Sequence, residues 1–150
     1  MAGFFIRKSC VVLEYLFTCT KIKNTISMRT IKFRGKTKNG KWVYGQLVFD
    51  ALKNDTPFII SAFSRFENWG DYVLPETIGQ FTGHFDLNGN EIYDGDEGEI
   101  TSIHVGVKAD GFKGVVKYYE SAFWVDNGSD AHLLWSDSYE FEITGNVHEK

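Results

Sequence analysis

The feature that most constrains this chain is a series of tight-turn dipeptides spread along it. Asn-Gly or Asp-Gly pairs stand at residues 39–40, 88–89, 94–95 and 110–111. Hairpin turns need residues that tolerate positive φ, and Asn, Asp and Gly do so best. Between the pairs, polar and apolar residues alternate over short stretches such as residues 30–34, which is the period of a half-buried strand. The pattern predicts short strands joined by turns, with no long helix.

The composition fits a β-rich fold. The chain has 150 residues, of which 43% are hydrophobic and 16% aromatic, with 15 glycines and only 2 prolines. A chain of this length is usually one domain or at most two small ones. Short strands at regular spacing are typical of barrels and sandwiches. We therefore expect an all-β fold with a small N-terminal β-sheet at residues 28–83, followed by an SH3-like β-barrel at residues 84–150.

The strands of this fold can be placed from the alternation and the turns. In the N-terminal part we expect them over residues 30–34, 42–49, 58–62, 72–74 and 77–82. In the C-terminal part we expect them over residues 99–107, 114–119, 122–125, 131–135 and 140–147. Residues 64–71 hold two aromatic residues followed by Gly70, and we predict a loop there,.

Residues 1–27 differ from the rest and are predicted to be an N-terminal extension outside the folded core. They carry four basic residues against Glu14, a net +3, and because the whole chain carries −4, residues 28–150 carry −7. Their apolar run is too short to span a membrane, so we expect no membrane association, and no signal-peptide cleavage site follows it. We interpret the extension as translation from a start codon upstream of Met28. A short peripheral helix and a targeting segment are the alternatives.

Both cysteines, Cys10 and Cys19, lie in this extension. Residues 28–150 can therefore supply no disulfide framework, no cysteine-based zinc site and no thiol nucleophile. The sequence also lacks a Gly-x-Ser-x-Gly nucleophile elbow and a glycine-rich phosphate loop. We expect neither enzyme activity nor a cofactor, and the cysteine usage fits a reducing cytoplasm.

Four blocks of residues 28–150 resemble, in order and spacing, the YopX family of bacteriophage and prophage proteins. They are residues 28–35 with 40–45 (MRTIKFRG and GKWVYG), 75–83 (PETIGQFTG), 86–96 (DLNGNEIYDGD) and 143–148 (ITGNVH). The resemblance implies a β-rich protein that contains a barrel, and it implies no enzyme activity. With the cysteine usage, it predicts a protein in the cytoplasm of a bacterial host cell.

The sequence departs from this family pattern at two places. Residues 97–99 (EGE) stand where the family continues directly into an apolar strand, and a glycine inside a strand often marks a bulge,. His84 and Phe85 are also unusual ahead of Asp86. We therefore expect an irregular strand register near residue 98.

A basic and aromatic stretch gives four candidate binding residues, Arg34, Lys36, Trp42 and Tyr44. If the first two strands form a hairpin, basic side chains share its outer face close to aromatic rings, on which nucleic-acid bases can stack. Lysines on an edge strand also protect it against pairing with other chains. The acidic remainder of the chain opposes phosphate binding, so the charge balance does not favour a nucleic-acid face.

The acidic stretch at residues 86–97 gives two further candidates, Asp94 and Asp96, because carboxylates at a barrel rim can face a pocket. Its spacing is similar to that of an EF-hand calcium loop, but Glu91 stands where such a loop needs glycine. Hydrogen-bonded turns are the preferred interpretation. The histidines are His84, His104, His132 and His148. They lack the spacing of a zinc motif, so no metal site is predicted.

Together these observations predict a non-enzymatic protein-interaction or accessory module. Its expected partner is a host or phage protein, with self-association as a further expectation. An exposed patch rich in Trp and Phe would favour this hypothesis. Two alternatives stay open: a protein that sequesters a small nucleotide or signalling ligand in a deep pocket, and a nucleic-acid-binding barrel.

Overall fold

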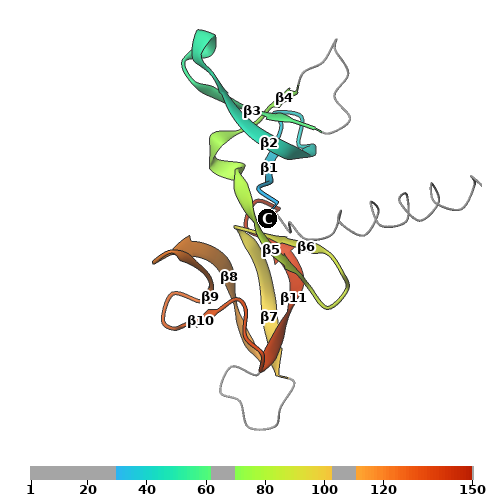
Figure 1. Ribbon diagram of the computed structural model, residues 1–150, viewed down its shortest axis with the longest axis vertical. Coiled ribbons are helices and arrows are strands. Elements are labelled where there is room, and N and C mark those ends of the chain that lie inside the picture. Colours follow the sequence, from blue (N-terminus) through green and yellow to red (C-terminus); the bar gives the residue numbers. More distant parts are fainter. Residues whose placement is uncertain (1–29, 62–69, 103–110, 150) are drawn as a thin grey trace, which may run out of the picture.

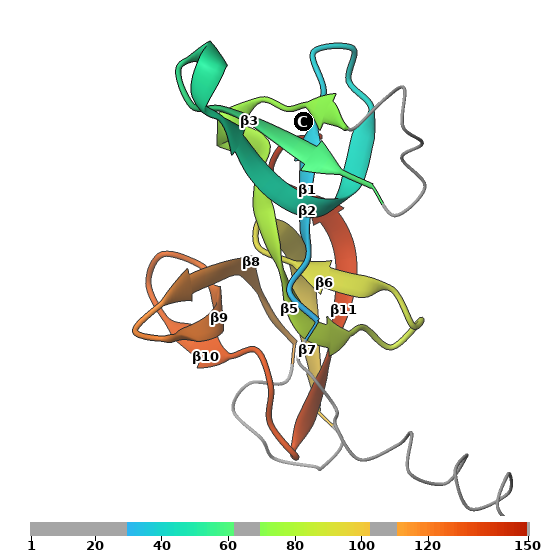
Figure 2. The ribbon, with the colours of Figure 1, turned by 45° about the horizontal axis from the view of Figure 1, so that its top comes forward.

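The computed structural model describes residues 30–61, 70–102 and 111–149, and within them the protein is all-β, as predicted. The strands form two antiparallel sheets. In both views the strands within residues 33–60 lie toward one end of the molecule, and the strands within residues 79–146 lie toward the other (Figures 1 and 2). The predicted extension at residues 1–27 and most of the predicted loop at residues 64–71 lie outside the described residues.

The first sheet has six strands in the order β4-β3-β2-β1-β5-β6. They are β1 (Phe33–Lys36), β2 (Trp42–Asp50), β3 (Thr56–Ile60), β4 (Asp71–Tyr72), β5 (Gly79–Phe85) and β6 (Glu91–Tyr93). Two short 3-10 helices, η2 (Ala51–Lys53) and η3 (Pro75–Thr77), join strands of this sheet. The predicted hairpin is confirmed: β1 pairs with β2, and Gly40 adopts the positive φ of 80° that the turn requires,.

The second sheet has five strands in the order β10-β9-β8-β7-β11. They are β7 (Asp96–Ser102), β8 (Phe112–Tyr119), β9 (Ala122–Asp126), β10 (Ala131–Leu133) and β11 (Tyr139–Asn146). The β8–β9 hairpin turns at Glu120 and Ser121, which both have positive φ, as a tight hairpin turn requires.

The expected SH3-like barrel needs a correction, because this sheet stays open. Its edge strands β10 and β11 stand at opposite ends of the strand order and do not pair with each other in the described residues. The outer edge of β11 is instead met by the turn that follows β5, where the Leu87 N–H donates to the Phe141 carbonyl at 3.2 Å. This turn supplies hydrogen bonds that barrel closure would otherwise provide.

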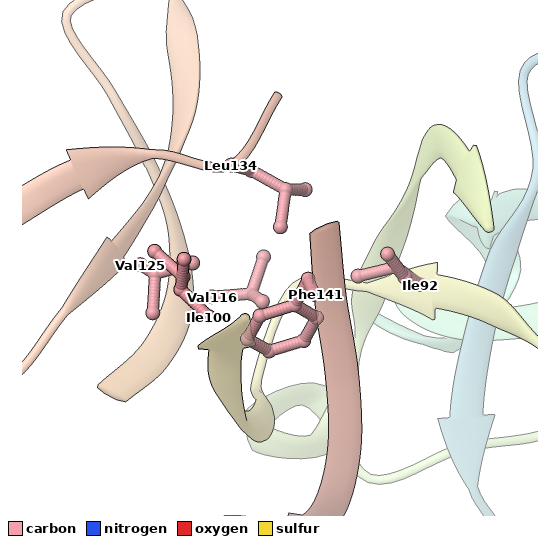
Figure 3. Packing of buried hydrophobic residues seen from close by; sticks show 6 residues of the cluster. All are labelled: Ile92, Ile100, Val116, Val125, Leu134 and Phe141. Atoms are coloured by element: carbon pink, nitrogen blue, oxygen red, sulfur yellow. The ribbon is translucent and has the colours of Figure 1, made fainter. Parts of the chain in front are cut away.

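The main core lies between the second sheet and β6 (Figure 3). Its buried members are Ile92, Ile100, Val116, Val125, Leu134 and Phe141. A smaller core of Val43, Ile59 and Val73 lies within the first sheet. Ile92 belongs to the first sheet by hydrogen bonding and to the main core by packing, and the predicted boundary between residues 83 and 84 falls inside β5. The division into two subdomains stays a prediction.

The irregular register expected near residue 98 is present in the β7–β11 pair. Ile143 lies opposite Gly98 and Gly145 lies opposite Glu97, so one step along β7 corresponds to two steps along β11. The additional residue is therefore Thr144, and the bulge lies in β11 and not in β7.

Candidate functional site

Four of the six candidate binding residues share one face of the β1–β2 hairpin. Arg34 lies opposite Tyr44, and Lys36 lies opposite Trp42, and in a strand alternate residues point to the same side. The hairpin thus gathers the basic and aromatic side chains, but the predicted outer face is wrong for Arg34, which is only 7% exposed. Their partners come from the β6–β7 region and from the end of the chain.

Arg34 is buried and forms an ion pair with Asp96 of the second sheet. The distance from Nη1 to the Asp96 Oδ1 is 2.7 Å, and the two side chains are 9% and 3% exposed. The guanidinium lies over the rings of Trp42 and Tyr93, 5.0 and 4.9 Å from their centroids. Arg34, Trp42, Tyr93 and Asp96 are called the Arg34 joint below, because they connect the two sheets.

The carboxylate of Asp96 is held by several donors besides Arg34. The Tyr93 N–H donates to Oδ2 at 2.7 Å, and Asn146 Nδ2 donates to Oδ1 at 3.2 Å. Asp94 contributes through its backbone, because its carbonyl oxygen accepts a hydrogen bond from Arg34 Nη2 at 3.2 Å. Burial raises the pKa of the Asp94 carboxyl,. Both aspartates therefore hold the turn and the joint together.

Two of the hairpin candidates bond to groups near the end of the chain. Lys36 Nζ donates to the His148 carbonyl at 3.0 Å, and Trp42 Nε1 donates to Glu149 at 2.8 Å. Outside the candidate set, Lys32 pairs with Glu91, whose carboxylate also accepts from the Tyr93 hydroxyl. On the predicted basic face, Lys32 and Arg34 are thus paired with carboxylates, and Lys36 is hydrogen-bonded to a carbonyl.

A cleft of about 740 Å³ lies beside the Arg34 joint. Two aromatic residues, Trp42 and Tyr44, line it together with Lys32 and Lys41. The Tyr44 ring is also 5.7 Å from that of Tyr93, and burial raises the pKa of its hydroxyl,. The cleft is therefore continuous with the joint, and it combines aromatic walls with cationic side chains.

The acidic turn at residues 86–90 is a structural feature, as the sequence indicated. The buried Asp86 carboxylate accepts hydrogen bonds from the backbone N–H groups of Asn88 and Asn90 at 2.9 and 2.7 Å, and from Asn90 Nδ2 at 3.0 Å. Burial alone would raise the pKa of Asp86, but these bonds and one from the Ile143 N–H hold it below its usual value,. The carboxylate is thus occupied by donors of its own turn and of β11.

Within the described ranges, no three His, Cys, Asp or Glu side chains gather in a way that could hold a metal ion. His84 stacks on Trp135, His132 meets the edge of Phe112, and the His148 ring lies 6.3 Å from that of Trp42. His104 lies outside the described residues. The described histidines are thus placed against aromatic rings.

One feature of the surface was not predicted from the sequence. Phe85, Leu87 and Trp135 are 59%, 47% and 62% exposed, and they line one cleft of about 240 Å³ between the β5–β6 turn and the segment before β11. These three residues are called the Phe85 patch below. The unusual Phe85 ahead of Asp86 was a signal in the sequence for this patch. Trp135 is distant from Phe85 along the chain, and the two residues line the same cleft only in the folded protein.

In the part of the chain that the structure describes, no helix is long and apolar enough to cross a membrane. A search of curated proteins gives no match to this chain. The family model described as "YopX protein" matches residues 32–150, which is most of the chain and nearly all of the fold described above. The chain therefore belongs to the YopX family.

Proposed function

We propose that this protein is a non-enzymatic protein-interaction module that binds its partner through the Phe85 patch. The observation that carries the proposal is the exposure of three large apolar side chains around one cleft. Leaving such side chains in water forgoes roughly 1.5–3 kcal/mol for each one that could be buried. Aromatic side chains are also enriched at the centres of protein interfaces.

The state of the other candidate groups supports a binding role over catalysis. The Asp96 and Asp86 carboxylates are occupied by structural hydrogen bonds, whereas a general acid or base needs a free position within reach of a substrate. Family membership supports an accessory role in a phage-infected or lysogenic bacterium, in the cytoplasm, with a host or phage protein as the partner.

A photo-cross-linking experiment tests the proposal. Benzoylphenylalanine replaces Trp135 in the full chain, which is expressed in the bacterial cells that carry the gene and irradiated there. We expect covalent adducts with one or few proteins. The matched control places the same photoreactive residue at Leu52, which is 96% exposed at the distant tip of the first sheet. Equal adduct patterns from both positions, or none from position 135, would contradict the proposal.

The cleft beside the Arg34 joint supports a second candidate function, the sequestering of a small nucleotide or signalling ligand. Its volume of about 740 Å³ is within the roughly 300–1,000 Å³ that small-molecule sites occupy. Trp42 and Tyr44 could stack on a planar base, while Lys41 could meet a phosphate,. Mass spectrometry of the protein purified from its host tests this: a bound nucleotide lost in a Tyr44→Ala variant supports it, and an empty protein opposes it.

The nucleic-acid alternative is weakened by the partners of the basic residues. Arg34 and Lys32 are each paired with a carboxylate, and a cation already paired releases little free energy on meeting a phosphate. We therefore place this alternative behind the other two.

A further inference from the structure

The cleft of the Phe85 patch has an apolar base and an acidic rim. Buried Leu134 and Phe141 line its base. Asp137 and Glu140 line it as well, and both are exposed. The described lining contains neither lysine nor arginine. A partner that fills this cleft with an apolar side chain must therefore pass two carboxylates.

Neither of these two carboxylates forms an ion pair within residues 30–61, 70–102 and 111–149. The ion pairs among the described residues join Lys32 to Glu91, Arg34 to Asp96, Lys113 to Glu99 and Lys117 to Asp126. Asp86 also lines the cleft, but its oxygens accept hydrogen bonds from its own turn. Among the described residues, Asp137 and Glu140 thus present negative charge to an incoming group without a cation paired to them.

The size of the cleft and its aromatic wall narrow the class of ligand. A volume of about 240 Å³ is below the roughly 300–1,000 Å³ of small-molecule sites, and it suits one or two side chains of a peptide. Trp135 stacks on His84 with a ring separation of 5.9 Å and an interplanar angle of 19°, and the residue remains 62% exposed. An arginine beside the cleft could lie over this ring and pair with a carboxylate at the same time.

We propose that the Phe85 patch recognises a basic peptide segment, in which an aromatic or long aliphatic side chain fills the cleft and an adjacent arginine or lysine pairs with Asp137 or Glu140. This inference rests on the proposed function and names its partner class. The apolar side chain supplies most of the affinity by leaving water. The charge pair supplies orientation and selects against acidic segments.

Peptide display tests the inference directly. A phage library of random twelve-residue peptides is selected on the immobilised full chain, and binders of the Trp135→Ala variant are removed. We expect the enriched peptides to combine an aromatic or leucine side chain with a neighbouring arginine or lysine. Their affinity should fall by about 30-fold in Trp135→Ala, as for a central interface residue, and it should weaken as salt is raised.

Charge reversal at the rim provides the decisive measurement. In the double variant Asp137→Lys with Glu140→Lys, the affinity for the enriched peptides should fall by about tenfold or more. Glu76→Lys, a reversal on the exposed 3-10 helix η3, is the matched control and should leave it unchanged. If thermal unfolding shows that the double variant does not fold, Asp137→Asn with Glu140→Gln replaces it, with the same direction expected.

The outcomes separate this inference from the proposed function. Enrichment of neutral or acidic peptides, no enrichment at all, or unchanged affinity in the rim variant overturns the basic-segment inference. Cross-links from position 135 would still support an interaction module in each of these cases. A cross-linked product of twice the chain mass would identify a second copy as the occupant, which overturns the inference and leaves the proposed function standing.

Discussion

The Arg34 joint and the Phe85 patch both combine aromatic rings with charged side chains, but they differ in burial and in the pairing of their charges. In the joint, each charge meets a partner from the other sheet, and the Arg34 and Asp96 side chains are nearly fully buried. In the patch, the rings remain exposed and the rim carboxylates lack a cation among the described residues. The difference indicates which groups are bonded within the fold and which are exposed to a partner.

Residue type alone would rank the joint above the patch as a binding site, and the contacts of the two sites reverse that order. Arginine next to tryptophan and tyrosine is a typical interface combination, and it directed attention to the β1–β2 hairpin. The interface that Arg34 serves is internal, because Asp96 and Tyr93 come from the β6–β7 turn region that joins the sheets. If the joint is part of the fold and the patch is not, substitutions in the joint should lower the free energy of unfolding much more than a substitution in the patch.

The largest effect is expected from breaking the ion pair of the joint. Asp96→Ala leaves the Arg34 guanidinium buried without its carboxylate and removes the acceptor of the Tyr93 N–H. Removing one partner of a buried pair costs about 3–5 kcal/mol. Urea unfolding, followed by tryptophan fluorescence, should show a loss of that size in the free energy of unfolding.

The control for this prediction removes both charges. The double variant Arg34→Met with Asp96→Ala has no uncompensated charge, so it should recover part of the loss. A loss below about 1 kcal/mol in Asp96→Ala would mean that the pair is solvated like a surface ion pair, and the joint would then resemble the patch.

A second effect is expected at Gly79, where the backbone approaches the joint closely. A Cβ atom at this position would lie 2.3 Å from the Asp94 carbonyl oxygen, the atom that accepts a hydrogen bond from Arg34. Gly79→Ala must displace this carbonyl, and overpacking of this kind costs about 1–3 kcal/mol. The thermal midpoint measures the loss.

Gly145→Ala is the matched control for Gly79. The nearest atom to its added Cβ is Glu97 Oε2 at 3.8 Å, an ordinary contact. It should leave the thermal midpoint almost unchanged. Equal losses in the two variants would indicate a general penalty for alanine in these strands and would argue against a tight joint.

The local parts of the fold were predictable because their signals are local. Asn39 and Gly40 specify a hairpin by their tolerance of positive φ, and the structure places β1 and β2 on either side of them. Asp86 heads a turn whose backbone N–H groups lie within reach of its own carboxylate,. In both cases the deciding contacts lie within a few residues.

The parts that could not be predicted depend on contacts between distant segments. Barrel closure depends on whether β10 reaches β11, and the Leu87 N–H that bonds to β11 comes from the first sheet's last turn. The pairing of Arg34 with Asp96 likewise follows from how the sheets meet. The exposure of Trp135 depends on what packs over it. Alternation and turn chemistry carry no information about any of these three.

A third effect concerns acid, and it tests the turn that carries the Phe85 patch. The native pKa of Asp86 is held below its ordinary value of 3.8 by hydrogen bonds that outweigh burial. A lowered native pKa contributes stability above the ordinary value and loses it as the pH falls through the native one. Asp86→Asn should therefore be less stable at pH 7, by about 1–2 kcal/mol for the lost charged hydrogen bonds, and should lose less on acidification below pH ~4.

Urea unfolding at pH 7 and at about pH 3 measures both parts of this prediction. Glu76→Gln is the matched control, because the Glu76 side chain is exposed and forms no ion pair among the described residues. Its stability should follow the parent protein at both pH values. An Asp86→Asn variant that loses as much stability on acidification as the parent would show that the carboxylate is solvated and that the turn is held by its backbone alone.

The smallest effect on stability is expected at Trp135, and it gives the clearest contrast with the Arg34 joint. The Trp135 side chain is exposed and stacks on His84 at the surface, so it contributes little to folding, and Trp135→Ala should change the free energy of unfolding by no more than about 0.5 kcal/mol. Urea unfolding followed by circular dichroism measures this without relying on the removed fluorophore. A loss above ~2 kcal/mol would make Trp135 a core residue and would remove the main support for a binding patch. A large ring that costs almost nothing to delete, beside a smaller carboxylate that costs several kcal/mol, would show that the fold depends on the joint and that the patch serves something other than folding.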